Sequence, residues 1–249
     1  MLTNDRKHTP ADKQFQRTAF MKDLQKPHES LQQQISSLEL ANTDILRRLI
    51  QICMFKDNEI GNHILRVGAI SRFLADNAGT TPEQAYFIGI AAPMHDIGKI
   101  GIPDSILYKP GAITPNEYEI LKTHTLIGAN IFTNPNSPEI EYARQVALYH
   151  HERWDGQGYP HGLSEEAIPF AARVTAVADV FDELLSWRMY KEPISEANAA
   201  KIITRNKGGQ FDPLVVEAFS ENLEEICHIR NTMMNKADNL WEQYPYHNN

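Results

Sequence analysis

Residues 81–99 read TPEQAYFIGIAAPMHDIGK, and the first of them have the chemistry of a helix N-terminus. Thr81 offers a side-chain oxygen that can cap the first turn, and Pro82 suits the first helical position because it has no backbone N–H to leave unpaired. Glu83 places a negative charge near the positive end of the helix dipole. Apolar residues then recur with a period near 3.6, so we predict a helix from Pro82 through residue 99.

Helical patterns of the same kind follow one another from about residue 53 to residue 230, separated by short Gly, Pro and Asn breaks. Residues 170–186 read FAARVTAVADVFDELLS, and a further helix opens with Asp212 as its cap and Pro213 at its first position. No run alternates apolar and polar residues as a half-buried strand does. The sequence therefore predicts an all-α fold, a helical bundle preceded by an N-terminal helical arm.

Composition narrows the classes of protein to be considered. With 249 residues and 42% hydrophobic side chains, the chain can bury one sizeable core. A formal net charge of -8 disfavours the broad basic face that holds long nucleic acid. Cys53 and Cys227 lie in or beside helical patterns, as reduced thiols do, and no apolar run approaches the ~18 residues of a membrane span. We expect a soluble, cytoplasmic protein.

We divide the chain into an N-terminal arm with an amphipathic helix, residues 1–52, and a main domain, residues 53–249, with a loosely held tail from about residue 239. Within the arm, one stripe of residues recurs in alternating steps of four and three. This heptad stripe consists of Leu31, Ile35, Leu38, Asn42, Ile45, Leu49 and Ile52. A polar Asn42 in such a stripe can fix the register of a parallel coiled coil, which predicts a homodimer. Packing of the stripe against the main domain is the alternative.

Histidines and acidic residues recur where the helical patterns have apolar neighbours. Glu59 and His63 are four residues apart, so on a helix they share one face. A lone histidine on a helix is more often an ordinary core or surface residue, but many ionisable groups among apolar neighbours are costly unless they share partners. The members of this set are Glu59, His63, His95, Asp96, His124, His150, His151 and Asp179.

Imidazole and carboxylate ligands without thiolates suit iron, manganese, nickel or zinc rather than a calcium site. The set is larger than one tetrahedral ion needs, so we predict a cluster of two or three metal ions in the core of the bundle. A carboxylate can bridge two such ions, which gives the adjacent His95 and Asp96 a rationale. Paired metals activate a water molecule and neutralise charge on a phosphoryl group, so the predicted reaction is phosphoester hydrolysis.

The His95–Asp96 pair followed by IGKIGIPD, together with HHERWDGQGYP at residues 150–160, resembles the HD-GYP family. This family is a branch of the HD superfamily of metal-dependent phosphohydrolases. Further matching segments between about residues 56 and 212 are GNHILRV, KPGAITPNEYEILKTH, RMYK and GGQFDP. The resemblance implies hydrolysis of cyclic di-GMP to linear pGpG or GMP, with 3',3'-cyclic GMP-AMP as a further substrate. It also implies that the eight residues above are metal ligands, with iron or manganese expected before nickel or zinc.

The resemblance assigns roles to further residues. Lys99 matches a lysine close to the metals that protonates the leaving oxygen or holds a phosphate, and Asp96 is expected to be essential for turnover. Arg188 and Lys191 match residues that grip the substrate phosphates, a task that suits the guanidinium fork. Tyr159 either contacts the substrate or packs its own loop.

The sequence departs from the family pattern at one segment, where LLSWRMYK replaces the usual LTSxRPYK. Leu185 therefore stands where the family has a hydroxyl, and Met189 stands where it has a proline, so the base preference is open. A non-catalytic module for binding cyclic dinucleotides or signalling proteins is one alternative function, which loss of ligands would favour. An HD phosphohydrolase acting on mononucleotides is another, against which the complete GYP segment argues.

Overall fold

The computed structural model describes residues 25, 27–35, 37–38, 41, 44–46, 48–50, 52, 61–187 and 192–243. The chain divides into two units, Met1–Ile45 and Leu46–Asn249. The described residues form helices, turns and an isolated β-bridge between Lys207 and Phe211, with no strand of a sheet, so the all-α fold class is confirmed. No helix in the described part of the chain has the length and apolar character to cross a membrane.

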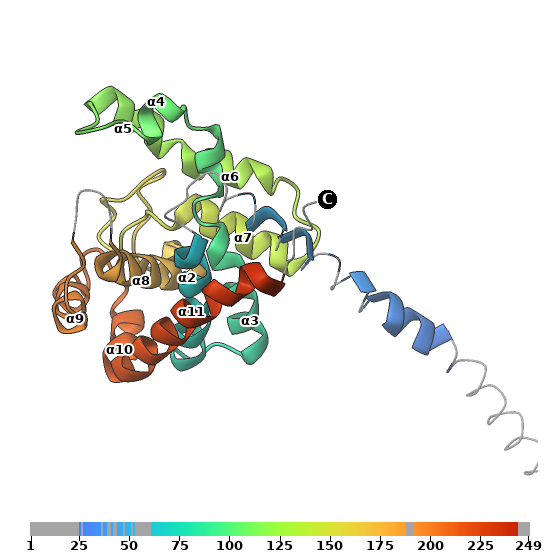
Figure 1. The fold of residues 1–249 in the computed structure, drawn as a ribbon. Helices are drawn as coiled ribbons and strands as arrows, with labels where there is room; N and C mark the ends of the chain where they lie inside the picture. Colours follow the sequence, from blue (N-terminus) through green and yellow to red (C-terminus); the bar gives the residue numbers. More distant parts are fainter. Residues whose placement is uncertain are drawn as a thin grey trace, which may run out of the picture. The chain divides into compact units, whose positions relative to one another are not determined.

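The second unit is a bundle whose helices are shown in Figure 1. In chain order they are α2 (Gly61–Asn77), α3 (Pro82–Ala91), α4 (Asp104–Leu107), α5 (Pro115–Lys122), α6 (His124–Ile131), α7 (Pro138–Tyr149), α8 (Phe170–Leu185), α9 (Glu196–Arg205), α10 (Pro213–Glu221) and α11 (Leu223–Gln243). Short 3-10 helices lie at η1 (Ala92–Met94), η2 (Ile97–Gly101) and η3 (Glu165–Ala167).

The core lies where α2 packs against α3, α8 and α11. Val67 of α2 and Val177 of α8 are fully buried, and the ring of Phe181 meets that of Phe219 edge-on, with centroids 4.9 Å apart. Each apolar side chain of this size contributes about 1.5–3 kcal/mol when it is removed from water. Burial therefore fixes α8 against α2, the two helices that carry His63 and Asp179.

The start of the helix predicted at Pro82 is confirmed. The Thr81 side chain accepts a hydrogen bond from the backbone N–H of Gln84 (3.2 Å), whose side chain accepts one from the Thr81 N–H (3.0 Å). The predicted continuation of this helix to residue 99 is wrong, because α3 ends at Ala91. Pro93 has no N–H to continue the ladder and its ring clashes with the preceding turn. His95 and Asp96 consequently lie in the turn between η1 and η2.

Two other helices follow the predicted pattern. The predicted helix at residues 170–186 is α8, and the Asp212 side chain accepts from the Leu214 N–H (2.8 Å) at the start of α10. The polar tail predicted from about residue 239 falls within α11 as far as Gln243, and residues 244–249 lie outside the described residues.

The described residues between 25 and 52 are helical. Leu31, Ile35 and Leu38 of the heptad stripe lie in the first unit and have exposed side chains. Leu46 belongs to the second unit and is buried in its core, and this places the division between the units a few residues before residue 52. Asn42 lies outside the described residues.

Candidate metal centre

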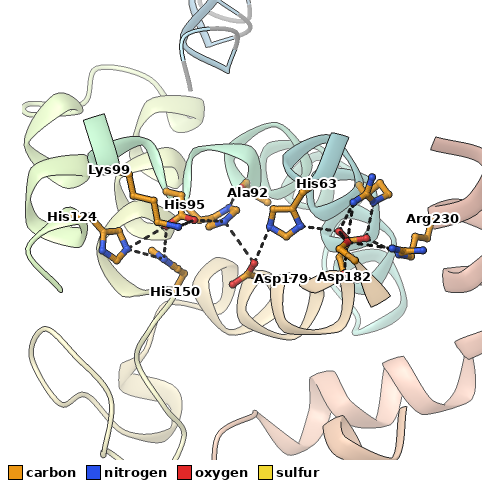
Figure 2. A network of polar contacts seen from close by, with 12 residues as sticks. His63, Ala92, His95, Lys99, His124, His150, Asp179, Asp182 and Arg230 are labelled. Atoms are coloured by element: carbon orange, nitrogen blue, oxygen red, sulfur yellow. Dashed lines mark hydrogen bonds and ion pairs between the residues drawn. The ribbon is translucent and has the colours of Figure 1, made fainter. Parts of the chain in front are cut away.

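The structure brings seven of the eight predicted ligands together in two groups. Within each group, one potential ligand atom from each residue lies within 4.8 Å of those from the others. Figure 2 shows most of these side chains in one row along the core. The four-residue group is Asp96, His124, His150 and His151, and the three-residue group is His63, His95 and Asp179. Glu59 lies outside the described residues.

Asp96 lies between the two groups. One of its oxygens, Oδ2, is 3.3 Å from His95 Nε2, and the other, Oδ1, is 3.3 Å from His124 Nε2. His95 Nε2 is also 3.7 Å from Asp179 Oδ1, so it faces carboxylates of both groups. Asp96 would therefore help to hold a cation at either group.

Three of the histidines are oriented by carbonyl groups of their own local segments. His95 Nδ1 donates to the Ala92 carbonyl (2.9 Å), His124 Nδ1 to Leu121 (2.7 Å) and His150 Nδ1 to Val146 (3.0 Å). A carbonyl oxygen can only accept, so each Nδ1 carries the proton. The neutral form of each ring would therefore turn the lone pair of Nε2 toward the centre. Burial lowers the pKa of His95, but the charges of Asp96 and Asp179 raise it above its ordinary value, so a cation there would have to displace a proton from Nε2.

The inward-facing atoms need a cation. The Nε2 atoms of His124 and His150 face each other at 3.4 Å, although the proton of each neutral ring is on Nδ1. His95 Nε2 and Asp96 Oδ1 are buried without a hydrogen-bond partner. Buried lone pairs left in this way cost free energy, whereas a transition-metal ion accepts imidazole and carboxylate lone pairs together. The residues present therefore fit a metal centre.

The electrostatic environment differs between the groups. Burial lowers the pKa of His150 well below its ordinary value and that of His151 to about 4, which keeps both rings in the neutral form that binds metals. Burial by itself also lowers the pKa of His63, but hydrogen bonds to Asp179 and Asp182 raise it to about 9. A cation at His63 must therefore displace a proton from Nε2.

Lys99 and Tyr159 border the four-residue group. The Lys99 Nζ donates to Asp96 Oδ2 (2.5 Å), and although burial alone would raise the pKa of Asp96, Lys99 and then His95 hold it well below its usual range. The Tyr159 ring stacks on His151, with centroids 4.7 Å apart and an interplanar angle of 28°. Arg188 and Lys191 lie outside the described residues.

Sequence reasoning missed the carboxylate that contacts the outer side of His63. Asp182 is fully buried, and its Oδ2 accepts from His63 Nδ1 at 2.8 Å. Arg66 and Arg230 pair with the same carboxylate. The spacing offered a signal, because Arg66 follows His63 by three residues and Asp182 follows Asp179 by three, which places each pair on one helix face.

Known proteins match most of the chain. A family model described as HD domain matches residues 45–215. A cyclic di-GMP phosphodiesterase from Thermotoga maritima is 41% identical over 217 residues, which cover 86% of this chain and 59% of that protein. A 3'3'-cGAMP-specific phosphodiesterase from Vibrio cholerae is 36% identical over 193 residues, which cover 78% of this chain and 37% of that protein. The chain therefore spans only part of the length of these relatives.

A crystal structure of a cyclic GMP-AMP-specific phosphodiesterase from Vibrio cholerae has the same fold. The TM-score is 0.56 at 18% sequence identity, over 78% of this chain and 53% of that one. HD phosphohydrolases depend on metals, and the two residue groups described above are candidate metal sites of this chain. Its HD pair, its GYP segment and the family match together show that the chain belongs to the HD domain family, in the HD-GYP branch that its motifs resemble.

Proposed function

We propose that the chain hydrolyses cyclic dinucleotides, with cyclic di-GMP as the first candidate substrate and 3',3'-cyclic GMP-AMP as the second. One structural observation carries the proposal: two unprotonated imidazole nitrogens, of His124 and His150, face each other at 3.4 Å beside the Asp96 carboxylate. Relatives named for both activities support the substrate class. The GYP segment, which lies within the loop after His151, favours this class over mononucleotides.

The residues of the site divide the work as follows. The two residue groups would hold metal ions, which would supply a deprotonated water molecule and positive charge for the phosphoryl oxygens. Asp96 holds the two groups at a fixed separation, and Lys99, which donates to Asp96, protonates the leaving oxygen or binds a phosphate. Arg188 and Lys191 grip the substrate phosphates. Tyr159, stacked on His151, closes the side of the four-residue group.

We propose two or three ions per chain, iron or manganese before nickel or zinc. The two residue groups supply two positions, and Glu59 is the candidate ligand of a third. Orientation of His63 is the alternative role for Glu59, and the ligand role is supported by Asp182, which accepts from His63 Nδ1. A third position would hold the linear product for a second cut. Elemental analysis of anaerobically purified protein should therefore give two or three ions, and Glu59→Ala should accumulate the linear dinucleotide instead of GMP.

Two statements about the protein's surroundings are also proposals. We propose a homodimer formed through the heptad stripe, since Leu31, Ile35 and Leu38 are exposed in the first unit. A cytoplasmic location and signalling-protein partners remain predictions that accompany the cyclic-dinucleotide substrate.

The deciding experiment is hydrolysis by the full chain after reconstitution with Mn(II), or with Fe(II) without oxygen. Cyclic di-GMP, 3',3'-cyclic GMP-AMP and GMP are incubated separately and the products are separated by chromatography. Loss of an outer partner of a metal ligand already costs about 10–100-fold, so Asp96→Asn should lose at least about 100-fold in turnover. Glu217→Gln, which breaks the exposed ion pair with Lys207, is the matched control and should keep full activity.

Each other result selects an alternative. Tight binding of a cyclic dinucleotide without turnover under every metal would indicate a binding module. Turnover of GMP alone would indicate an HD phosphohydrolase of mononucleotides. Equal turnover by Asp96→Asn and wild type would contradict the assignment of this centre as the active site.

A further inference from the structure

A buried ion-pair network joins the last helix, α11, to a predicted metal ligand. Asp182 Oδ1 accepts from Arg66 Nε at 2.7 Å and from Arg230 Nε at 2.8 Å, while Oδ2 accepts from Arg66 Nη2 and from His63 Nδ1, both at 2.8 Å. Arg230 belongs to α11, Arg66 and His63 to α2, and Asp182 to α8 (Figure 2). Three helices therefore meet at one fully buried carboxylate.

The network fixes the orientation of the His63 ring. Two guanidinium groups keep Asp182 ionised, and an ionised carboxylate can only accept hydrogen bonds, so the proton on the outer side of the ring belongs to Nδ1. Nε2 then faces Asp179 Oδ1, at 3.1 Å, and the rest of the three-residue group. A carboxylate behind a ligating imidazole restrains the ring and makes it a better donor to a metal.

Arg230 also holds the end of the helix that carries these carboxylates. Its Nη2 donates to the Leu185 carbonyl (3.0 Å) and to Ser186 Oγ (3.3 Å), at the C-terminal end of α8. Asp179 lies on the same face of α8 as Asp182, one turn earlier. Arg230 therefore restrains both the ring of His63 and the helix that supplies Asp179.

The four-residue group is held in another way. The outer nitrogens of His124 and His150 donate to the carbonyls of Leu121 and Val146, three and four residues earlier in the chain. These contacts belong to local segments and do not involve α11. His63 and Asp179 of the three-residue group are thus tied to the C-terminal helix, whereas His95, His124 and His150 are oriented by local carbonyls.

We infer that Arg230 is a positioning residue for one metal position, the one made by His63, His95 and Asp179, and that it leaves the affinity of the position at Asp96, His124, His150 and His151 unchanged. The inference rests on the proposed metal centre but not on the identity of the substrate. It assigns α11 a role at the centre although α11 supplies none of the predicted ligands.

The test is a calorimetric titration of the metal-free full chain with Mn(II), with elemental analysis after dialysis at limiting metal. Wild type should bind in two resolvable steps. Arg230→Met has a side chain of similar length but lacks all the hydrogen bonds, and one step should weaken by about 10–100-fold while the other stays unchanged. Arg230→Lys keeps the positive charge but lacks the guanidinium group with its several N–H donors. It should therefore weaken the same binding step by a smaller factor than Arg230→Met does.

The matched control breaks a different Arg–Asp pair, in which Asp212 is buried and Arg173 is partly buried. Arg173 Nη1 donates to Asp212 Oδ2 at 2.6 Å, between α8 and the start of α10. Arg173→Met should lower the midpoint of thermal unfolding without metal and leave both binding steps unchanged. If Arg230→Met weakens both binding steps equally, Arg230 is merely structural and the inference fails. The inference also fails if Arg173→Met weakens one binding step and leaves the other unchanged.

A spectroscopic readout keeps the inference testable if Arg230→Met does not fold. Nitrogen-15 NMR of labelled histidines in the wild type and in Arg230→Lys, each loaded with diamagnetic Zn(II), reports which ring nitrogen carries the proton. His63 should carry it on Nδ1. A proton on Nε2, or a single binding step in the wild type, would overturn the inference. Failure of the proposed hydrolysis would not, because metal affinity is measured without substrate.

Discussion

At the scale of single residues, Gly98 shows how closely the backbone must approach to bring the ligands together. A Cβ added there would lie 1.8 Å from the His124 carbonyl oxygen and 2.5 Å from the Gly128 nitrogen, so η2 rests directly on α6. This contact brings Asp96 beside His124. The need for glycine arises from packing, since its φ lies outside the left-handed range.

We predict that Gly98→Ala separates η2 from α6, because backbone atoms cannot yield as a flexible side chain can. Overpacking of this kind typically costs about 1–3 kcal/mol, and the four-residue group should lose metal affinity as well. Urea unfolding and Mn(II) titration measure the two effects. Gly209→Ala is the control, since the nearest atoms to its added Cβ are 3.6 and 3.8 Å away. Wild-type values for Gly98→Ala would contradict the prediction.

The gathering of these side chains could be expected from sequence because each lies in a motif, and the structure brings the described ones together, while their role as metal ligands stays a prediction. Asp182 and Arg230 could not be predicted in the same way. Hydrogen bonds join Asp182 to Arg230, 48 positions away in the sequence, and to His63, 119 positions away. Pairings at such sequence separations depend on how three helices pack. A helical pattern gives the face on which a residue lies but not the partner that this face will meet.

At the scale of elements, the start of α5 is fixed by a charged capping box. The Glu117 carboxylate accepts from the Thr114 N–H (2.7 Å) and from Lys109 Nζ (2.9 and 2.7 Å). The hydrogen bond from Lys109, and then those from Thr114, lower the pKa of Glu117 to about 2. Because the folded-state pKa is depressed, this stabilisation is complete above the unfolded value of about 4.3 and is lost as pH falls toward 2.

We predict that Glu117→Gln lowers the free energy of unfolding at pH 7 and that its difference from wild type shrinks as pH falls from about 4.3 toward 2. The difference should shrink because wild type then loses the same charge. Urea unfolding at a series of pH values measures it. The box at the start of α3 has the neutral Gln84 in the same position, so Gln84→Ala should give a difference that does not change over this range. If the difference in free energy of unfolding between Glu117→Gln and wild type does not change with pH, the charge of Glu117 does not stabilise the capping box.

Helix starts could be predicted because capping depends on residues at most three apart, as at Pro82 and Pro213. The end of α3 could not be placed from the apolar period alone, since that period continues past Pro93 while α3 ends at Ala91 and the backbone continues as the 3-10 helix η1. The break is what aims His95 and Asp96 at the centre. The apolar period therefore failed to predict the helix end at the site, where the backbone conformation places His95 and Asp96 in the candidate metal centre.

At the scale of the whole molecule, the heptad stripe predicts assembly. An exposed stripe of Leu and Ile is stabilised when it packs against the same stripe of a second chain, because apolar surface is then removed from water. We therefore expect light scattering to show a dimer. Replacing Leu31 and Leu38 by lysine should give a monomer, because like charges would then meet along the seam. Gln33→Lys adds a lysine at an exposed position of this helix that does not belong to the stripe and should leave the dimer intact. If the wild type remains monomeric at high concentration, the dimer prediction is wrong and packing of the stripe within its own chain is favoured instead.

The hydrogen bonds that orient the histidines also imply an order of events as the chain folds. Those behind His95, His124 and His150 span three or four residues, whereas His63 reaches Asp179 and Asp182 across 116 and 119 residues. Short loops close early and at small entropic cost, and long ones close late. The rings of the first set acquire their direction with their own helix ends, before α8 docks on α2. We therefore expect the proposed ion at His63 to bind at the close of folding, and an ion held between His63 and Asp179 would keep this long loop closed.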